Sequence, residues 1–299
     1  MFSKTKTKKG ECITTLDKKV HDALLAMYDT PDPNNPKFKI QGYDKDHAER
    51  TTRIVLMAAQ KMNVNARYLP DFEVASLLHD IGRVGIDPEL FGKIFRLAQE
   101  HNLPVRITDI RLAHPEISDS KASDFYLKLI SPILVDNGIQ ITSKVIDHIN
   151  MRMAHKERLS ATIRKLKPQL NNLKITIKPW MKKVILFYYY PQLMKNESKE
   201  VHKLGMLLVA CENFEAYNNR RRGRDYYCRE KESLKDAFDK IKKFKDNGLI
   251  SGQVLKVLQD LTIEGDLDNI IKESRGIPQN VPLPREDIVF KKHLKTILR

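Results

Sequence analysis

The residues most suited to chemistry surround a histidine–aspartate pair. His79 and Asp80 are adjacent in the segment LLHDIGRVGIDPELF, residues 77–91. An imidazole nitrogen beside a carboxylate oxygen can bind one divalent cation, although an isolated pair of this kind is also common on protein surfaces. His47 lies 32 residues earlier, in the apolar segment HAERTTRIVLMAA. Helices that carry these residues could converge on one ion in the core of a bundle.

A further ligand has to come from later in the chain. The apolar segment VACENFEAY, residues 209–217, contains Glu212 and Glu215. Three residues apart on a helix, they share one face. Burying an unpaired carboxylate is costly, so a metal ion would explain them; the alternative is that they face solvent or pair with lysines.

The elements that must position these residues are predicted to be helices. Apolar spacing predicts helices near 16–27, 44–62, 70–82, 178–190 and 199–218, several pieces over 105–165 broken near Pro115, Pro132 and Gly138, and two helices over 232–274. Alternating strand patterns are almost absent, which predicts an all-α fold. Residues 160–178 are strongly basic and are expected to form an inserted hairpin or a surface arm.

At this point the sequence resembles the HD superfamily of phosphohydrolases, and most closely its HD-GYP branch, which hydrolyses cyclic di-GMP. The segment HDIGRVGIDPELF is very similar to the branch's HD motif, and HPEIS, residues 114–118, is similar to its next motif. CENFEAY and RRRGR, residues 211–217 and 220–224, follow in the family's order. The four segments cover roughly residues 40–245.

The resemblance implies an HD-domain helical bundle and a role for each matching residue. Residues 1–40 would form an N-terminal tail and helix, 41–245 the HD-like domain with an insertion at about 140–180, and 246–299 a C-terminal helical extension. The implied metal ligands are His47, His79, Asp80, His114 and Glu212. Asp80 and Arg83 would be catalytic, and Arg83, Arg221 and Arg224 would bind the substrate phosphate.

The chain departs from the family where a His-His pair and a GYP signature are expected. Either VIDHIN matches that segment, and His148 is an extra metal ligand, or VILFYYYP matches it, and the tyrosines 188–190 replace the histidines. The spacing to CENFEAY favours the second placement. The second metal position is therefore incomplete, and the site is expected to hold one or two divalent ions, with iron, manganese and magnesium as the candidates.

The net charge and the composition indicate which kinds of partner the chain could bind. The formal net charge is +15, from 53 Lys and Arg against 38 Asp and Glu, which favours an anionic partner. The basic residues are spread along the whole chain, so nucleic acid is less favoured than a small phosphate ester. No apolar run is long enough to span a membrane, the start has no secretory signal, and the three cysteines form no metal or disulfide pattern, so a cytoplasmic protein is expected.

These observations predict a metal-dependent phosphodiesterase that hydrolyses cyclic di-GMP or a related nucleotide phosphate ester. The alternative is a catalytically inactive HD-GYP-like signalling module that binds a nucleotide, or a protein partner through the basic insertion.

Overall fold

The computed structural model describes residues 14–32, 34–225 and 232–297, and this part of the chain is all-α, as predicted. The α-helices are α1 Lys18–Leu25, α2 Lys45–Lys61, α3 Leu69–Leu77, α4 Pro88–Glu100, α5 Ile107–Ala113, α6 Ala122–Asp136, α7 Ser143–Met153, α8 His155–Asn172, α9 Pro179–Leu186, α10 Lys199–Asn218, α11 Arg220–Asp225, α12 Leu234–Asp246, α13 Gly252–Glu264, α14 Asp268–Arg275 and α15 Arg285–Ile297. Short 3-10 helices are η1 Ala26–Tyr28, η2 Ala66–Tyr68, η3 Ile81–Arg83, η4 Asp119–Lys121 and η5 Pro191–Met194. Within the described residues, strand is limited to the antiparallel pair β1 Thr30–Pro31 and β2 Lys39–Ile40.

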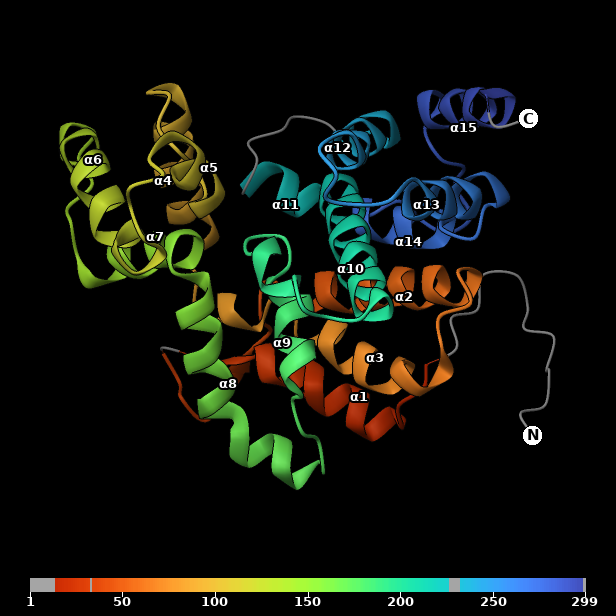
Figure 1. The fold of residues 1–299 in the computed structure, drawn as a ribbon, viewed down its shortest axis with the longest axis horizontal. Coiled ribbons are helices and arrows are strands. Elements are labelled where there is room, and N and C mark those ends of the chain that lie inside the picture. The colour runs from red at the N-terminus through yellow and green to blue at the C-terminus, as the bar shows by residue number, and fades with distance from the viewer. Residues whose placement is uncertain (1–13, 33, 226–231, 298–299) are drawn as a thin grey trace.

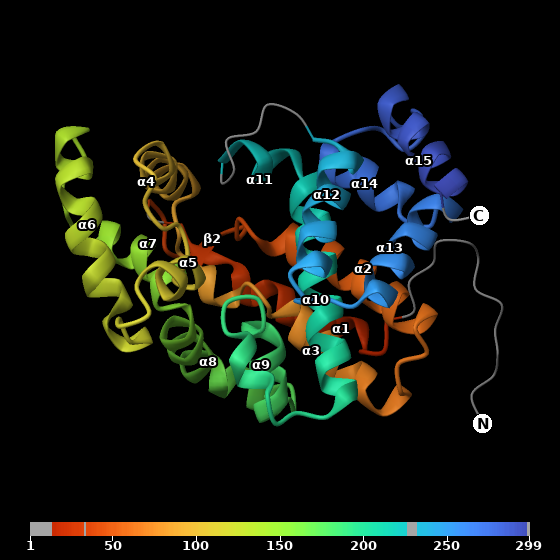
Figure 2. The ribbon, with the colours of Figure 1, turned by 45° about the horizontal axis from the view of Figure 1, so that its top comes forward.

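The helices gather around α10, which packs against α2, α9 and α12 (Figure 1). Helices α4–α7 lie on one side of this centre and α12–α15 on the other, in both views (Figures 1 and 2). Two apolar clusters fill the interior. One is formed mainly by the helices before residue 190, and the other joins α2 and α10 to the C-terminal helices. Because α2 and α10 are central, polar residues on their inner faces are removed from water.

Helix α3, which leads to the His-Asp pair, is shorter than the sequence predicts. Pro70 lies in the first turn of α3, where the missing N–H costs nothing, as the sequence predicts. The helix then ends at Leu77 instead of continuing to Gly82, and residues 78–80 form a turn that leads into η3. The tyrosine hydroxyl of Tyr28 donates to the carbonyl of Leu77 at 2.8 Å and holds the end of this helix. His79 and Asp80 therefore lie on a turn.

The prediction that residues 160–178 form a basic hairpin or surface arm is wrong. Residues 155–172 form the helix α8, and its apolar residues Leu159, Ile163 and Leu170 are buried in the first apolar cluster. Their spacing of four and seven residues places them on one face, so the lysines and arginines between them form the solvated face of a structural helix.

Two further expectations differ from the structure. Pro132 lies inside α6 and does not break it. The segment 232–274 forms three helices, α12, α13 and α14, because Gly265 takes a left-handed conformation with φ 84° and ends α13. None of the described helices has the length and apolar character that a membrane crossing requires.

Candidate metal centre

Three side chains from two segments meet in the interior. His47 lies in the first turn of α2, and His79 and Asp80 lie in the turn after α3. All three are buried, with at most 5% of each residue exposed. The Nε2 atoms of the two histidines are 3.1 Å apart, and the Asp80 Oδ2 atom is 3.6 Å from His47 Nε2 and 3.7 Å from His79 Nε2. The structure therefore forms a compact group of three donor atoms that could hold a metal ion.

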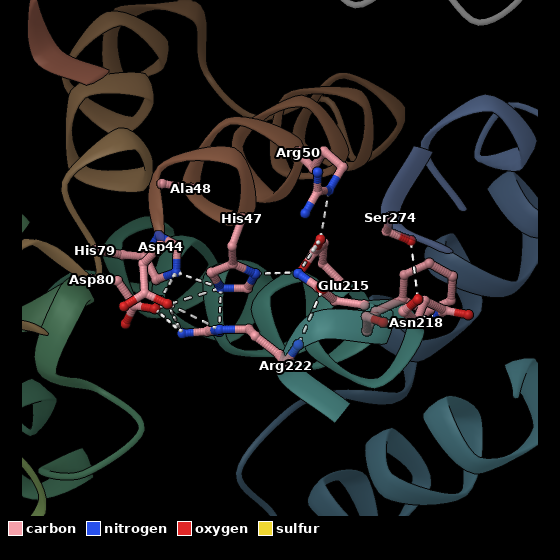
Figure 3. Close-up of polar contacts among 12 residues, drawn as sticks. Asp44, His47, Ala48, Arg50, His79, Asp80, Glu215, Asn218, Arg222 and Ser274 are labelled. Carbon is pink, nitrogen blue, oxygen red and sulfur yellow. Dashed lines mark hydrogen bonds and ion pairs between the residues drawn. The ribbon is translucent and has the colours of Figure 1, made fainter. Parts of the chain in front are cut away.

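The hydrogen bonds of the outer ring nitrogens fix the tautomers of both histidines. His79 Nδ1 lies 2.7 Å from the carbonyl oxygen of Ser76, which can only accept, so Nδ1 carries the proton. His47 Nδ1 contacts the carboxylate of Glu215 in the same way (Figure 3). In the neutral imidazoles the two Nε2 lone pairs then face each other, an arrangement that is repulsive unless a positive group lies between them.

The separations of the donor atoms suit a single ion. Ligands at about 2.1 Å from a divalent metal lie roughly 3.0–3.4 Å apart around an octahedral or tetrahedral centre. The three observed separations of 3.1, 3.6 and 3.7 Å are close to this range. Two imidazoles and one carboxylate suit iron and manganese better than magnesium, which prefers oxygen ligands alone.

Glu215 supports the site from behind His47. Its Oε2 atom accepts from His47 Nδ1, and its Oε1 atom accepts from Arg50 Nε at 2.7 Å. Asn219 adds its amide at 3.2 Å, and Arg50 reaches Glu273 of α14 at 3.7 Å. A carboxylate that holds the outer nitrogen of a histidine orients the ring and raises its basicity as a metal ligand. The sequence placed Glu215 on this face but gave it no such role.

The guanidinium of Arg222 enters the centre from α11 (Figure 3). Its Nη1 atom lies 2.6 Å from His47 Nε2, and its Nη2 atom donates to Asp44 Oδ1 at 3.0 Å and to Asp80 Oδ2. Arg222 is 1% exposed and is the largest fully buried side chain described. Sequence reasoning missed both Arg222 and Asp44. Asp44 was detectable, because it precedes His47 by three residues and so shares its helical face.

The electrostatic environment keeps the donors in the states that bind metal. Burial, reinforced by the charge of Arg222, lowers the pKa of His47 well below its ordinary value. Burial alone would raise the pKa of Asp80, but the charges of Arg222 and Arg83 outweigh it and hold that pKa well below its usual range. His47 is therefore neutral and Asp80 ionised at neutral pH.

The remaining predicted ligands lie outside the compact group. Glu212 is near enough that the charge of Asp80, after the larger effect of burial, raises its pKa, and its role as a ligand stays a prediction. His114 is partly exposed, with Nδ1 3.5 Å from Glu116. His148 has both nitrogens engaged by main chain: Nε2 accepts from the N–H of Asp87 at 2.8 Å, and Nδ1 donates to the carbonyl of Lys144 at 2.6 Å.

The three arginines predicted to bind phosphate lie in different environments. Arg83 is buried, with Nε 3.4 Å from Asp44 Oδ2 and 3.8 Å from Asp80 Oδ2. Arg221 is exposed and lies over the ring of Tyr43, 4.0 Å from its centroid. Arg224 belongs to α11, but its side chain lies outside the described residues.

A cleft of about 440 Å³ adjoins the centre at Asp44 and Arg83. Its walls also include Tyr28, Tyr43, Lys144 and residues 84–87. A volume of this size suits a small organic ligand. The cleft carries the cations Arg83 and Lys144 and the acidic Asp44, so it offers charge of both signs next to the three donors.

Another buried histidine lies beside the centre. The ring of His155 packs against Tyr189 at 5.0 Å between centroids and lies against Gly82. Burial lowers the pKa of His155 to about 4, partly opposed by the charge of Asp80. No sequence pattern indicates a role for His155, since no metal-ligating partner lies at a suitable spacing in the sequence.

Comparisons with family models, with curated proteins and with solved structures find no match for this chain. The resemblance to the HD-GYP branch therefore rests on the sequence segments alone, and the geometry of the centre has to be interpreted by its own chemistry.

Proposed function

We propose that the protein is a metal-dependent phosphohydrolase whose divalent ion is held by His47, His79 and Asp80, and that it acts on a phosphodiester such as cyclic di-GMP or a related nucleotide. The observation that carries this proposal is the convergence of two imidazole Nε2 atoms and one carboxylate oxygen within 3.7 Å of one another. A site in which lone pairs face each other at this distance is suited to a cation.

Each residue has a distinct task in this proposal. The two histidines and Asp80 hold the ion, and Glu215 fixes the proton of His47 on Nδ1 so that Nε2 faces inward. A bound divalent ion supplies a Lewis acid for the phosphoryl group and lowers the pKa of a bound water. Arg83 lies between the donors and the cleft, where its fixed charge would stabilise the negative charge that develops on the phosphate oxygens.

The adjoining cleft supports a nucleotide-sized substrate. Tyr43 offers an aromatic face at the cleft wall, and Lys144 adds a cation at its rim. Lys144 pairs with Asp87 at 2.8 Å, so it is held near the entrance. A base could pack on the tyrosine while a phosphate meets Arg83.

One observation favours the alternative of an inactive binding module. The Arg222 guanidinium contacts His47 Nε2 and Asp80 Oδ2, which are two of the three donor atoms. A protein in which this arginine stands permanently in place of the ion would keep the cleft but lack the Lewis acid.

Metal binding and hydrolysis separate the two functions. Metal-free protein and its His79→Ala variant are incubated with excess Mn²⁺ or Fe²⁺, passed over a desalting column under matched conditions and analysed by plasma emission. We expect about one ion per wild-type chain and none in the variant, together with hydrolysis of cyclic di-GMP by the loaded wild type alone. Absence of stoichiometric metal in wild type overturns the proposal and favours the binding module. Metal without hydrolysis of any phosphodiester supports the metal site and refutes the hydrolase.

A further inference from the structure

The position of Arg222 bears on how the centre is regulated. The segment RRRGR, residues 220–224, contains consecutive arginines that differ sharply in exposure. Arg220 and Arg221 are exposed, whereas Arg222 is buried in the interior. An arginine carries its charge at every physiological pH, so its burial requires acceptors that compensate the charge.

Those acceptors are the atoms that would bind the metal. Nη1 of Arg222 contacts His47 Nε2 at 2.6 Å, and Nη2 contacts Asp80 Oδ2. Asp44 completes the set by accepting from Nε at 3.2 Å and from Nη2 at 3.0 Å. The guanidinium thus satisfies the inward lone pair of His47 and the carboxylate of Asp80. One lone pair cannot serve a hydrogen-bond donor and a metal ion at the same time.

The charges lead to the same conclusion. Two guanidinium groups, of Arg222 and Arg83, face the two carboxyl groups of Asp44 and Asp80 in the interior. A divalent ion added to this set would increase the positive charge of the interior, where unpaired charge is strongly disfavoured. Withdrawal of Arg222 offsets part of that increase and frees the donor atoms.

We propose that Arg222 is an internal competitor of the metal: its guanidinium occupies the centre in the metal-free protein, and the ion binds only when this side chain withdraws. The inference rests on the proposed metal site and adds its regulation. The moving part is α11, a six-residue helix held at its start by the hydrogen bond from the N–H of Arg222 to Asn219 Oδ1, at 3.3 Å. A ligand or partner that shifts α11 would control metal loading.

Calorimetric titration with Mn²⁺ alone tests this competition. Metal-free wild type is compared with Arg222→Gln and with the matched control Arg220→Gln, whose side chain lies on the same helix but is exposed. Binding of Mn²⁺ to wild type must break the charged hydrogen bonds of Arg222, so we expect Arg222→Gln to bind about tenfold to a hundredfold more tightly. Arg220→Gln should bind with the wild-type affinity.

Loss of Arg222 removes one of the two guanidinium groups that face the buried Asp44 and Asp80 and could prevent folding of the metal-free variant. Arg222→Lys retains a charge but cannot contact Asp44, Asp80 and His47 at once, and we expect its affinity for Mn²⁺ to exceed that of wild type by about threefold or more. If both variants bind Mn²⁺ with the wild-type affinity or more weakly, the competition is refuted and the metal site stands. If no protein in the set binds Mn²⁺, the metal site itself is refuted, and the competition with it.

Discussion

Replacement of Glu215 by glutamine should expose the role of the buried carboxylate behind His47. Each oxygen of Glu215 serves a different donor: Oε2 accepts from His47 Nδ1, and Oε1 accepts from Arg50 Nε at 2.7 Å. A glutamine has one acceptor oxygen and one NH₂ group. In either orientation the NH₂ group faces an N–H of His47 or of Arg50, so one buried donor loses its acceptor.

The cost of the Glu215→Gln substitution follows from the loss of one acceptor. Leaving one buried donor unsatisfied costs about 1–3 kcal/mol, and the burial of Glu215, 1% exposed, excludes rescue by water. If the NH₂ group faces His47, the imidazole avoids this clash only by moving its proton to Nε2, where the proton would face Arg222 Nη1 and would prevent metal binding. Loss of such a carboxylate typically lowers metal affinity 10- to 100-fold.

Urea unfolding of the metal-free protein, followed by circular dichroism, measures the first effect, and Mn²⁺ titration measures the second. The matched control is Glu273→Gln. Glu273 pairs with Arg53 at 2.7 Å and also faces Arg50, but its side chain is 39% exposed. Its loss should cost less than about 1 kcal/mol. If Glu215→Gln is no more destabilising than Glu273→Gln, the two-donor interpretation of Glu215 is refuted.

Two further predictions concern α8, which lies beneath the His-Asp turn. Leu159 is 1% exposed, so Leu159→Ala should lower the free energy of unfolding by about 2–5 kcal/mol, as measured by urea denaturation. The pKa of His155 is about 4 in the folded protein and about 6.5 in the unfolded chain. Between these two pH values His155 is protonated in the unfolded chain and neutral in the folded protein, which favours unfolding. Stability should therefore fall between pH 6.5 and 4, by about 3 kcal/mol in total from this group, and His155→Phe should remove that part of the pH dependence.

Each of these two predictions about α8 has its own control. Leu112 is 85% exposed, and Leu112→Ala should change stability by less than about 0.5 kcal/mol. Equal effects of the two leucine substitutions would show that α8 is a surface arm after all. For His155 the readout is the difference between the unfolding free energies at pH 7 and pH 5 in metal-free protein. An equal difference in wild type and variant would mean that His155 titrates normally.

Local sequence pattern was sufficient for much of the fold. The all-α class and the bounds of α10 follow from apolar residues that recur with helical spacing, because each helix must bury one face. The same pattern was present in residues 155–172, where Leu159, Ile163 and Leu170 mark a buried face. The density of lysine and arginine obscured it there. Pro132 misled for a different reason: proline usually breaks a helix, but this residue is exposed and lies inside the continuous helix α6.

The centre was predictable only in part. His47, His79 and Asp80 could be proposed from residue type and order, and the structure brings these three together. Glu215 and Arg222 meet His47 across 168 and 175 residues of sequence, and no local pattern encodes such pairings. Helical geometry does not resolve RRRGR either: successive residues turn by about 100°, and the run alone does not show which arginine points inward.

The burial of Arg222 changes the interpretation of the arginine cluster at residues 220–224. A run of arginines near a proposed phosphohydrolase centre suggests contacts to substrate, and exposed Arg221, on the ring of Tyr43, remains suited to that task. Arg222 points into the interior and contacts Asp44 and Asp80. In the proposed function the two neighbours would therefore meet different anions: Arg221 would meet an incoming phosphate, whereas Arg222 already contacts the carboxylates of the centre.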